Sequence, residues 1–136
     1  MAQRYFTAEE ANELLPEVRA AAERLVEHRR AAVAVTVKRA RLVSRIAGNG
    51  GDFDPREPRE LQEELERETD AAAEALVRLD RIGVIVKDAD RGLVDFPALR
   101  EGGEEVLLCW QVGEDEVAYW HGLEEGFAGR KPLPLD

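Results

Sequence analysis

Apolar residues recur every three or four positions along the first part of the chain. Between residues 8 and 47, the positions that keep this spacing are Leu15, Val18, Ala22, Leu25, Ala32, Val43 and Ile46. This spacing is typical of one face of an α-helix. Thr7 and Glu10 fit a capping box, in which each side chain accepts a hydrogen bond from the backbone N–H of the other. The pattern therefore predicts a helix over residues 8–47.

A second helical pattern follows a strong turn signal. The turn signal is GNGGD at residues 48–52, after which Asp54 and Pro55 suit the N-cap and the first helical position. The apolar face of the second pattern consists of Leu61, Leu65, Ala72, Ala75, Leu76, Leu79 and Ile82. Gly83 suits the C-terminal cap. This pattern predicts a helix over residues 55–82.

Charge favours antiparallel pairing of the two predicted helices. Residues 28–47 contain six basic groups and no acidic group, whereas residues 48–68 contain eight acidic and three basic groups. The two halves nearest the turn therefore attract each other. The first helix is the longer one, so its N-terminal part extends beyond the second helix. That apolar overhang needs a cover, and the remaining apolar material lies in residues 84–121.

Residues 84–121 consist of short apolar runs separated by turn signals. Two runs, VIVK at 84–87 and LVDF at 93–96, flank the polar loop DADRG, which is typical of a β-hairpin. Pro97 is expected to end the second strand. The run VLLCW at 106–110 indicates a central strand that is covered on both faces. Residues 117–120 are predicted as a fourth strand, although residues 113–116 equally suit the start of a short helix.

These elements predict an α+β fold over residues 1–136, which is an ordinary length for one domain. A long antiparallel two-helix hairpin, resembling a coiled coil, packs at its base on a small antiparallel β-sheet of three or four strands. Residues 5–6 are a candidate additional edge strand. The β-meander occupies residues 84–121, and residues 122–136 are expected to form a loop and tail because they are rich in Gly and Pro.

Charge and cysteine content exclude several classes of function. The formal net charge is −10, and this field repels nucleic acid and anionic membranes over most of the surface. The basic stretch between Arg29 and Arg45 has no interleaved aromatic residues, so we expect no nucleic-acid partner. The single cysteine, Cys109, excludes an internal disulfide and fits a reducing compartment. The start of the chain resembles no signal peptide, and no run is long enough to span a membrane. We therefore expect a cytoplasmic protein.

Five short strings resemble a known family when they are taken together and in order. They are RYFTAEEANELLPEVR near the start, and KDADRGLVDFP, LCWQVGE, YWH and GFAGR near the end. The chain resembles, over essentially its whole length, a bacterial family classed as domain of unknown function 2203. The resemblance implies a small cytoplasmic protein in which the C-terminal strings belong together. It implies no activity and no catalytic residue.

A metal site is one candidate chemistry. Cys109 and His121 are side chains that zinc favours, and oxygen ligands are available from Asp88, Asp95, Glu114, Glu124 and Glu125. The spacing matches no compact metal-binding motif. The interpretation that we prefer from sequence is that Cys109 is a small buried core residue, as free cysteines commonly are.

A ligand pocket is a second candidate. Arg130 follows the turn at residues 126–129, whose backbone N–H groups are able to converge on an anion that the guanidinium also binds. Trp110, Trp120 and His121 are the expected walls of such a pocket. The competing interpretation, which we favour, is that Arg130 pairs with Asp95 or Asp88 and fixes the tail to the sheet.

Nucleophilic catalysis is a third candidate. Cys109 and His121 would act together if the thiol were partly exposed, but no nucleophile elbow and no third orienting residue accompany them. The sequence therefore favours a non-enzymatic binding or interaction module that self-associates through the helical hairpin as a homodimer or binds a protein partner. The alternative is a small metal- or ligand-dependent enzyme whose site comprises Asp88, Asp95, Cys109, His121 and Arg130. The sequence indicates no specific cofactor.

Overall fold

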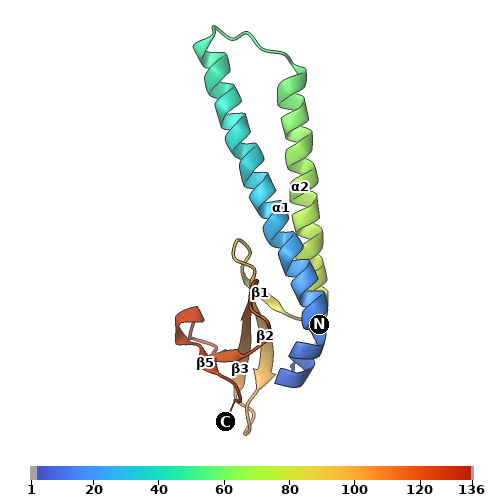
Figure 1. The fold of residues 1–136 in the computed structure, drawn as a ribbon, viewed down its shortest axis with the longest axis vertical. Helices are drawn as coiled ribbons and strands as arrows, with labels where there is room; N and C mark the ends of the chain where they lie inside the picture. Colours follow the sequence, from blue (N-terminus) through green and yellow to red (C-terminus); the bar gives the residue numbers. More distant parts are fainter. Residues whose placement is uncertain (1–2, 136) are drawn as a thin grey trace.

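The protein is a long helical hairpin with a small β-sheet at its base (Figure 1). The computed structural model describes residues 3–135, so the last residue of the predicted tail lies outside the described residues. Helix α1 spans Ala8–Gly48 and helix α2 spans Arg56–Ile82, which confirms both predicted helices to within one residue. The capping box at the start of α1 is present, with Thr7 Oγ1 accepting from Glu10 N and Glu10 Oε1 accepting from Thr7 N.

The two helices pack along a continuous apolar seam. Its buried members include Leu25, Val35 and Leu42 from α1 and Ala72, Ala75 and Leu79 from α2. An ion pair crosses the seam as the charge pattern predicts, with Arg45 Nη2 2.6 Å from Glu57 Oε1, and His28 Nδ1 lies 2.6 Å from Glu68 Oε2. These pairs are partly exposed, so their main effect is on register rather than on stability. Among the described residues, no helix has an apolar stretch that is long enough to cross a membrane.

The sheet is antiparallel and follows chain order. Its strands are β1 (Ile85–Asp88), β2 (Leu93–Leu99), β3 (Glu105–Gln111), β4 (Tyr119–Gly122) and β5 (Lys131–Pro132). The predicted meander of three or four strands is confirmed and is extended by β5, a two-residue strand within the predicted tail. Before β5 the chain forms one short 3₁₀ helix, η1 (Phe127–Gly129). Residues 113–116 form a turn and bend rather than a short helix.

The two faces of the sheet have different surroundings. The inner face packs on the helices and contributes Val94, Phe96, Ala98, Val106, Leu108, Trp110 and Trp120 to one hydrophobic core with α1 and α2. Leu15 and Val18, from the overhang of α1, belong to the same core. The alternate residues of β2, β3 and β4 project from the outer face, which includes Asp95, Cys109 and His121. Strand β3 is buried on both faces, as its continuous apolar run predicts.

Two expectations about the edge of the sheet are wrong. Pro97 does not end β2, which continues to Leu99. The carbonyl of Pro97 accepts a hydrogen bond from Phe6 N at 2.8 Å, so the backbone groups of Pro97 face away from β3. The missing N–H of Pro97 therefore removes no hydrogen bond from the β2–β3 ladder. Residues 5 and 6 form no strand. Phe6 instead bonds to β2 through the Pro97 carbonyl, two residues beyond Asp95, which pairs with Ile85 at the start of β1.

Gly92 should be less tolerant of a side chain than Gly113. Both have positive φ, of +65° and +104°, which costs an alanine about 1–2 kcal/mol. A Cβ at Gly92 would lie 2.3 Å from Val112 Cγ2, whereas a Cβ at Gly113 meets nothing within 4 Å. Chemical denaturation should show that Gly92→Ala lowers the free energy of unfolding by about 2–4 kcal/mol and Gly113→Ala by about 1–2 kcal/mol. Equal losses would mean that the loop before β2 is not packed as described.

Candidate metal centre on the outer face of the sheet

Three adjacent strands bring together a carboxylate, a thiol and an imidazole. Asp95 of β2 pairs directly with Cys109 of β3, and His121 of β4 pairs with Leu107, two residues from Cys109 on the same face. Their potential ligand atoms, a carboxylate oxygen, Sγ and an imidazole nitrogen, all lie within 4.8 Å of one another. The sheet register therefore forms a cluster from residues that lie up to 26 positions apart in sequence.

This Asp95–Cys109–His121 cluster is closed to solvent. The three residues are 1%, 1% and 3% exposed. His121 Nε2 lies 3.2 Å from both carboxylate oxygens of Asp95, and His121 Nδ1 lies 2.8 Å from Gly122 O. Since a carbonyl only accepts, Nδ1 must carry a proton and donate it. Nε2 and the Asp95 carboxylate then share one further proton, as an ion pair or as two neutral groups.

Burial controls the protonation of the other two members. Burial raises the pKa of Asp95, and the neighbouring His121 acts in the opposite direction. Burial, together with the negative charge of Asp95, raises the pKa of Cys109 to about 12, although the positive charge of Arg130 acts to lower it. Cys109 is therefore a neutral thiol at neutral pH. This environment works against nucleophilic attack by a Cys109 thiolate.

The donor set is suited to a divalent transition metal. Zinc binds sulfur, imidazole nitrogen and carboxylate oxygen, and its ligand atoms lie about 3.3 Å apart in a tetrahedral site with bonds near 2.0 Å. The separation of 3.2 Å between His121 Nε2 and the Asp95 oxygens is close to that spacing. A carboxylate, a thiolate and a neutral imidazole together cancel the charge of one divalent cation. Such a centre would bury no net charge.

Arg130 lies beside the cluster but makes a different ion pair from the expected one. Its Nη2 is 2.6 Å from Glu114 Oε2, rather than from Asp95 or Asp88. The guanidinium carbon lies 4.0 Å from the centroid of the Tyr119 ring and 4.4 Å from that of the Phe127 ring. Its Nε is buried and has no hydrogen-bond partner among residues 3–135. Gly129 N and Arg130 N donate to the carbonyls of Gly126 and Phe127, so these two N–H groups are not available to the candidate anion cradle.

The other sequence candidates lie outside the cluster. Asp88 Oδ1 accepts from the N–H groups of Asp90 and Arg91 and so closes the β1–β2 loop. Trp110 and Trp120 are on the inner face of the sheet and are part of the hydrophobic core, not walls of a pocket beside His121. Glu124 and Glu125 are exposed, and Glu125 pairs with Lys131.

Tyr119 and Phe127 are the participants that the sequence analysis missed. The available signal for Tyr119 was its position two residues before His121, which places it on the same face of β4. Phe127 gave no comparable signal, since it reaches Arg130 through η1 and not through strand alternation.

The Cys109 thiol should be unreactive in the folded protein. With a pKa of about 12, roughly one thiol in ten thousand is ionised at pH 8. Absorbance measurement with an aromatic disulfide reagent should therefore show modification that is slower by at least about 100-fold in native than in unfolded protein. Equal rates in the two states would contradict the buried, neutral thiol.

Comparison with known proteins identifies the family but no function. Over residues 4–133 the chain matches the family model described as Uncharacterized conserved protein (DUF2203). No curated protein and no solved structure matches the chain. In the folded chain the four C-terminal strings that resemble the family contribute Asp95, Cys109, His121 and Arg130, one residue each, to the outer face of the sheet or its immediate surroundings. Because the matched range is nearly the entire sequence, the chain belongs to the DUF2203 family of uncharacterised conserved proteins.

Proposed function

We propose that this protein is a non-enzymatic binding module whose β-sheet binds one divalent transition metal ion, zinc by ligand preference, through Asp95, Cys109 and His121. One observation carries the proposal. Three different ligand atoms, from three neighbouring strands, lie within 4.8 Å of one another in a site that is almost completely buried. Sulfur and imidazole ligands favour zinc and similar ions over calcium and magnesium, which prefer oxygen.

The surroundings of the cluster support a fourth ligand from outside the three strands. Three protein ligands leave one position of a tetrahedral ion for another group. Arg130 offers a buried Nε–H without an acceptor among residues 3–135, and its charge acts on the Cys109 thiol. An oxygen ligand in the fourth position would give this N–H an acceptor.

Burial is the reason for preferring metal binding to metal-dependent catalysis. A catalytic zinc keeps a position that substrate and water can reach. The three ligand side chains are at most 3% exposed, so a substrate has no direct route to them. The site therefore fits a bound ion that stabilises or regulates the fold better than one that turns over substrate.

Native mass spectrometry should detect one zinc ion per chain on protein purified without a chelator. Cys109→Ala and His121→Ala should each weaken zinc binding by more than about 100-fold, since loss of an indirect supporting group alone costs about 10–100-fold. His28→Ala removes the only other histidine, which pairs with Glu68 on the hairpin, and should leave binding unchanged. Far-UV circular dichroism should check that each variant is folded. A folded wild-type protein that retains no zinc after incubation with the ion would exclude the proposed function.

Zinc affinity should rise steeply with pH. Binding must release the Cys109 proton, because a thiol binds zinc as the thiolate. Competition with a chromophoric chelator should show an affinity that increases by at least about tenfold per pH unit between about pH 6 and pH 8. Cys109→Ala has no thiol proton to release, so its dependence on pH should be weaker by about tenfold per unit. Affinity that does not change with pH would mean that zinc binds elsewhere.

A further inference from the structure

Charged side chains form an exposed stripe along almost the whole length of α2. Its members are Glu60, Glu63, Arg67, Glu74, Arg78 and Arg81. Their spacing keeps them on one side of the helix, and all six are exposed. None of the six makes a side-chain hydrogen bond or ion pair with another residue in the range 3–135. This holds even for Glu63 with Arg67 and for Glu74 with Arg78, which have the i,i+4 spacing at which ion pairs form along a helix. The stripe thus differs from the charges along the seam with α1, which are paired.

The signs of this α2 stripe reverse about its midpoint, which lies between Asp70 and Ala71. Each charge has an opposite charge at the same distance on the other side of that midpoint. The couples are Glu60 with Arg81, Glu63 with Arg78, and Arg67 with Glu74. When two identical helices pack antiparallel about a two-fold axis, each residue lies opposite the residue equally far from the axis on the partner. A second copy would therefore present an opposite charge to each of these six residues. Asp70 is exposed on the same side of the helix and would lie near the partner's Asp70 at the axis, so this one position opposes the pairing.

The same stripe opposes the parallel arrangement. In a parallel, in-register pair each residue meets its own copy, so all six positions would bring like charges together. Like charges across an interface suppress the wrong arrangement more effectively than opposite charges strengthen the right one. The stripe consequently selects direction and register together.

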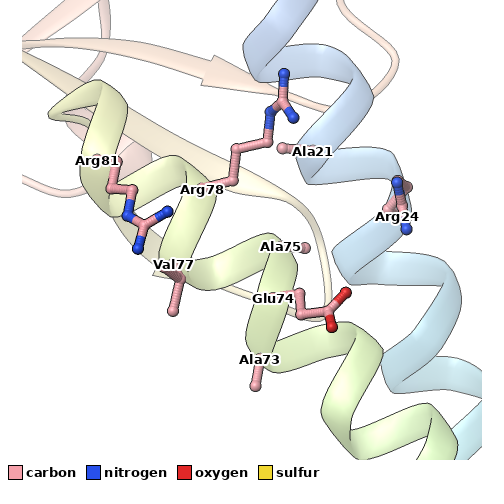
Figure 2. A pocket seen from close by; sticks show the side chains of 8 residues that line it. All are labelled: Ala21, Arg24, Ala73, Glu74, Ala75, Val77, Arg78 and Arg81. Atoms are coloured by element: carbon pink, nitrogen blue, oxygen red, sulfur yellow. The ribbon is translucent and has the colours of Figure 1, made fainter.

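A groove at one end of the stripe matches the charge at the other end. Glu74, Arg78 and Arg81 line a groove of about 560 Å³ together with Arg24 from α1. Figure 2 shows Arg78 extending across the groove toward Ala21 of α1, while Ala73 and Val77 point away on the outer side of α2. The groove has three arginines and one glutamate. In the antiparallel register the acidic end of the partner's α2, around Glu60 and Glu63, would lie against these arginines.

We propose that the outer face of α2 binds a second copy of this chain, in an antiparallel register centred between Asp70 and Ala71, to form a two-fold symmetric dimer held by six ion pairs. Exposed ion pairs are individually weak and are screened by salt. Val77, which is 47% exposed, adds only limited apolar contact. The dimer is therefore sensitive to ionic strength. It is independent of the metal centre, which lies on the sheet.

Two charge-reversal variants test the register by sedimentation velocity. Arg78→Glu/Arg81→Glu makes four of the six pairs acidic against acidic, and Glu60→Arg/Glu63→Arg makes the same four basic against basic. At low ionic strength each variant alone should dimerise at least about 100-fold more weakly than the wild type. An equimolar mixture should form heterodimers with an affinity within about tenfold of the wild type, since all six pairs are again of opposite sign. The wild-type dimer should dissociate in about 0.5 M salt.

A matched control distinguishes this surface from a general effect of charge. Arg30→Glu/Arg39→Glu changes the net charge by the same amount on exposed positions of α1 and should dimerise like the wild type. A monomeric wild type at low ionic strength would overturn the proposal, and so would a mixture of the two α2 variants that stays monomeric. A dimer that neither α2 variant weakens would use another face, such as the exposed Val33 and Val37 of α1, and would equally overturn it.

Discussion

Burial of β3 on both faces is the constraint on which the rest of the structure depends. Side chains alternate along a strand, so Leu108 and Trp110 pack toward the helices while Leu107 and Cys109 face the other way. The overhang of α1 needs the first set as its cover, and this need fixes the register of the sheet. A slip of one residue would bring Cys109 into the core below α1 and expel Trp110 from it. The position of the polar cluster is thus a consequence of hydrophobic packing on the opposite face.

That register places polar groups where water does not reach them. An isolated buried charge costs several kcal/mol, so Asp95 at 1% exposure requires a compensating partner. His121 meets this requirement with a shared proton, and a divalent ion would meet it with coordination bonds. Both forms of the cluster are electrically neutral. In the proposed metal site the balance between them would follow pH and metal concentration, because metal binding releases protons and an ion that binds only the folded chain stabilises it by mass action.

The sequence predicts elements of this fold better than it predicts the site. Helical period and capping residues locate α1 and α2 to within one residue, because these signals are local. The prediction at Pro97 is wrong because a proline ends a strand only where its missing N–H would face a neighbouring strand. The direction in which the N–H position of Pro97 points depends on the register of the sheet, which is not a local property of the sequence. The register was also needed to predict the cluster. Asp95, Cys109 and His121 were all named as candidates from the sequence, but so were Asp88, Trp110 and Trp120. Selecting the three that lie together requires knowing which strands are adjacent and which face each residue occupies.

Helix α2 carries two charge patterns, of which one pairs with α1 and the other is left for the proposed dimer. Glu57 and Glu68 flank the seam and pair with Arg45 and His28, so they contribute to the register of the hairpin. The stripe from Glu60 to Arg81 lies on another side of the helix and makes no ion pair within residues 3–135, so its charges are available for the proposed contact with a second helix. Two-fold symmetry makes each stripe residue occur twice in such a contact, so one substitution alters two ion pairs. For this reason a charge pattern with little apolar surface can define the direction and register of a dimer whose overall affinity remains low and salt-dependent.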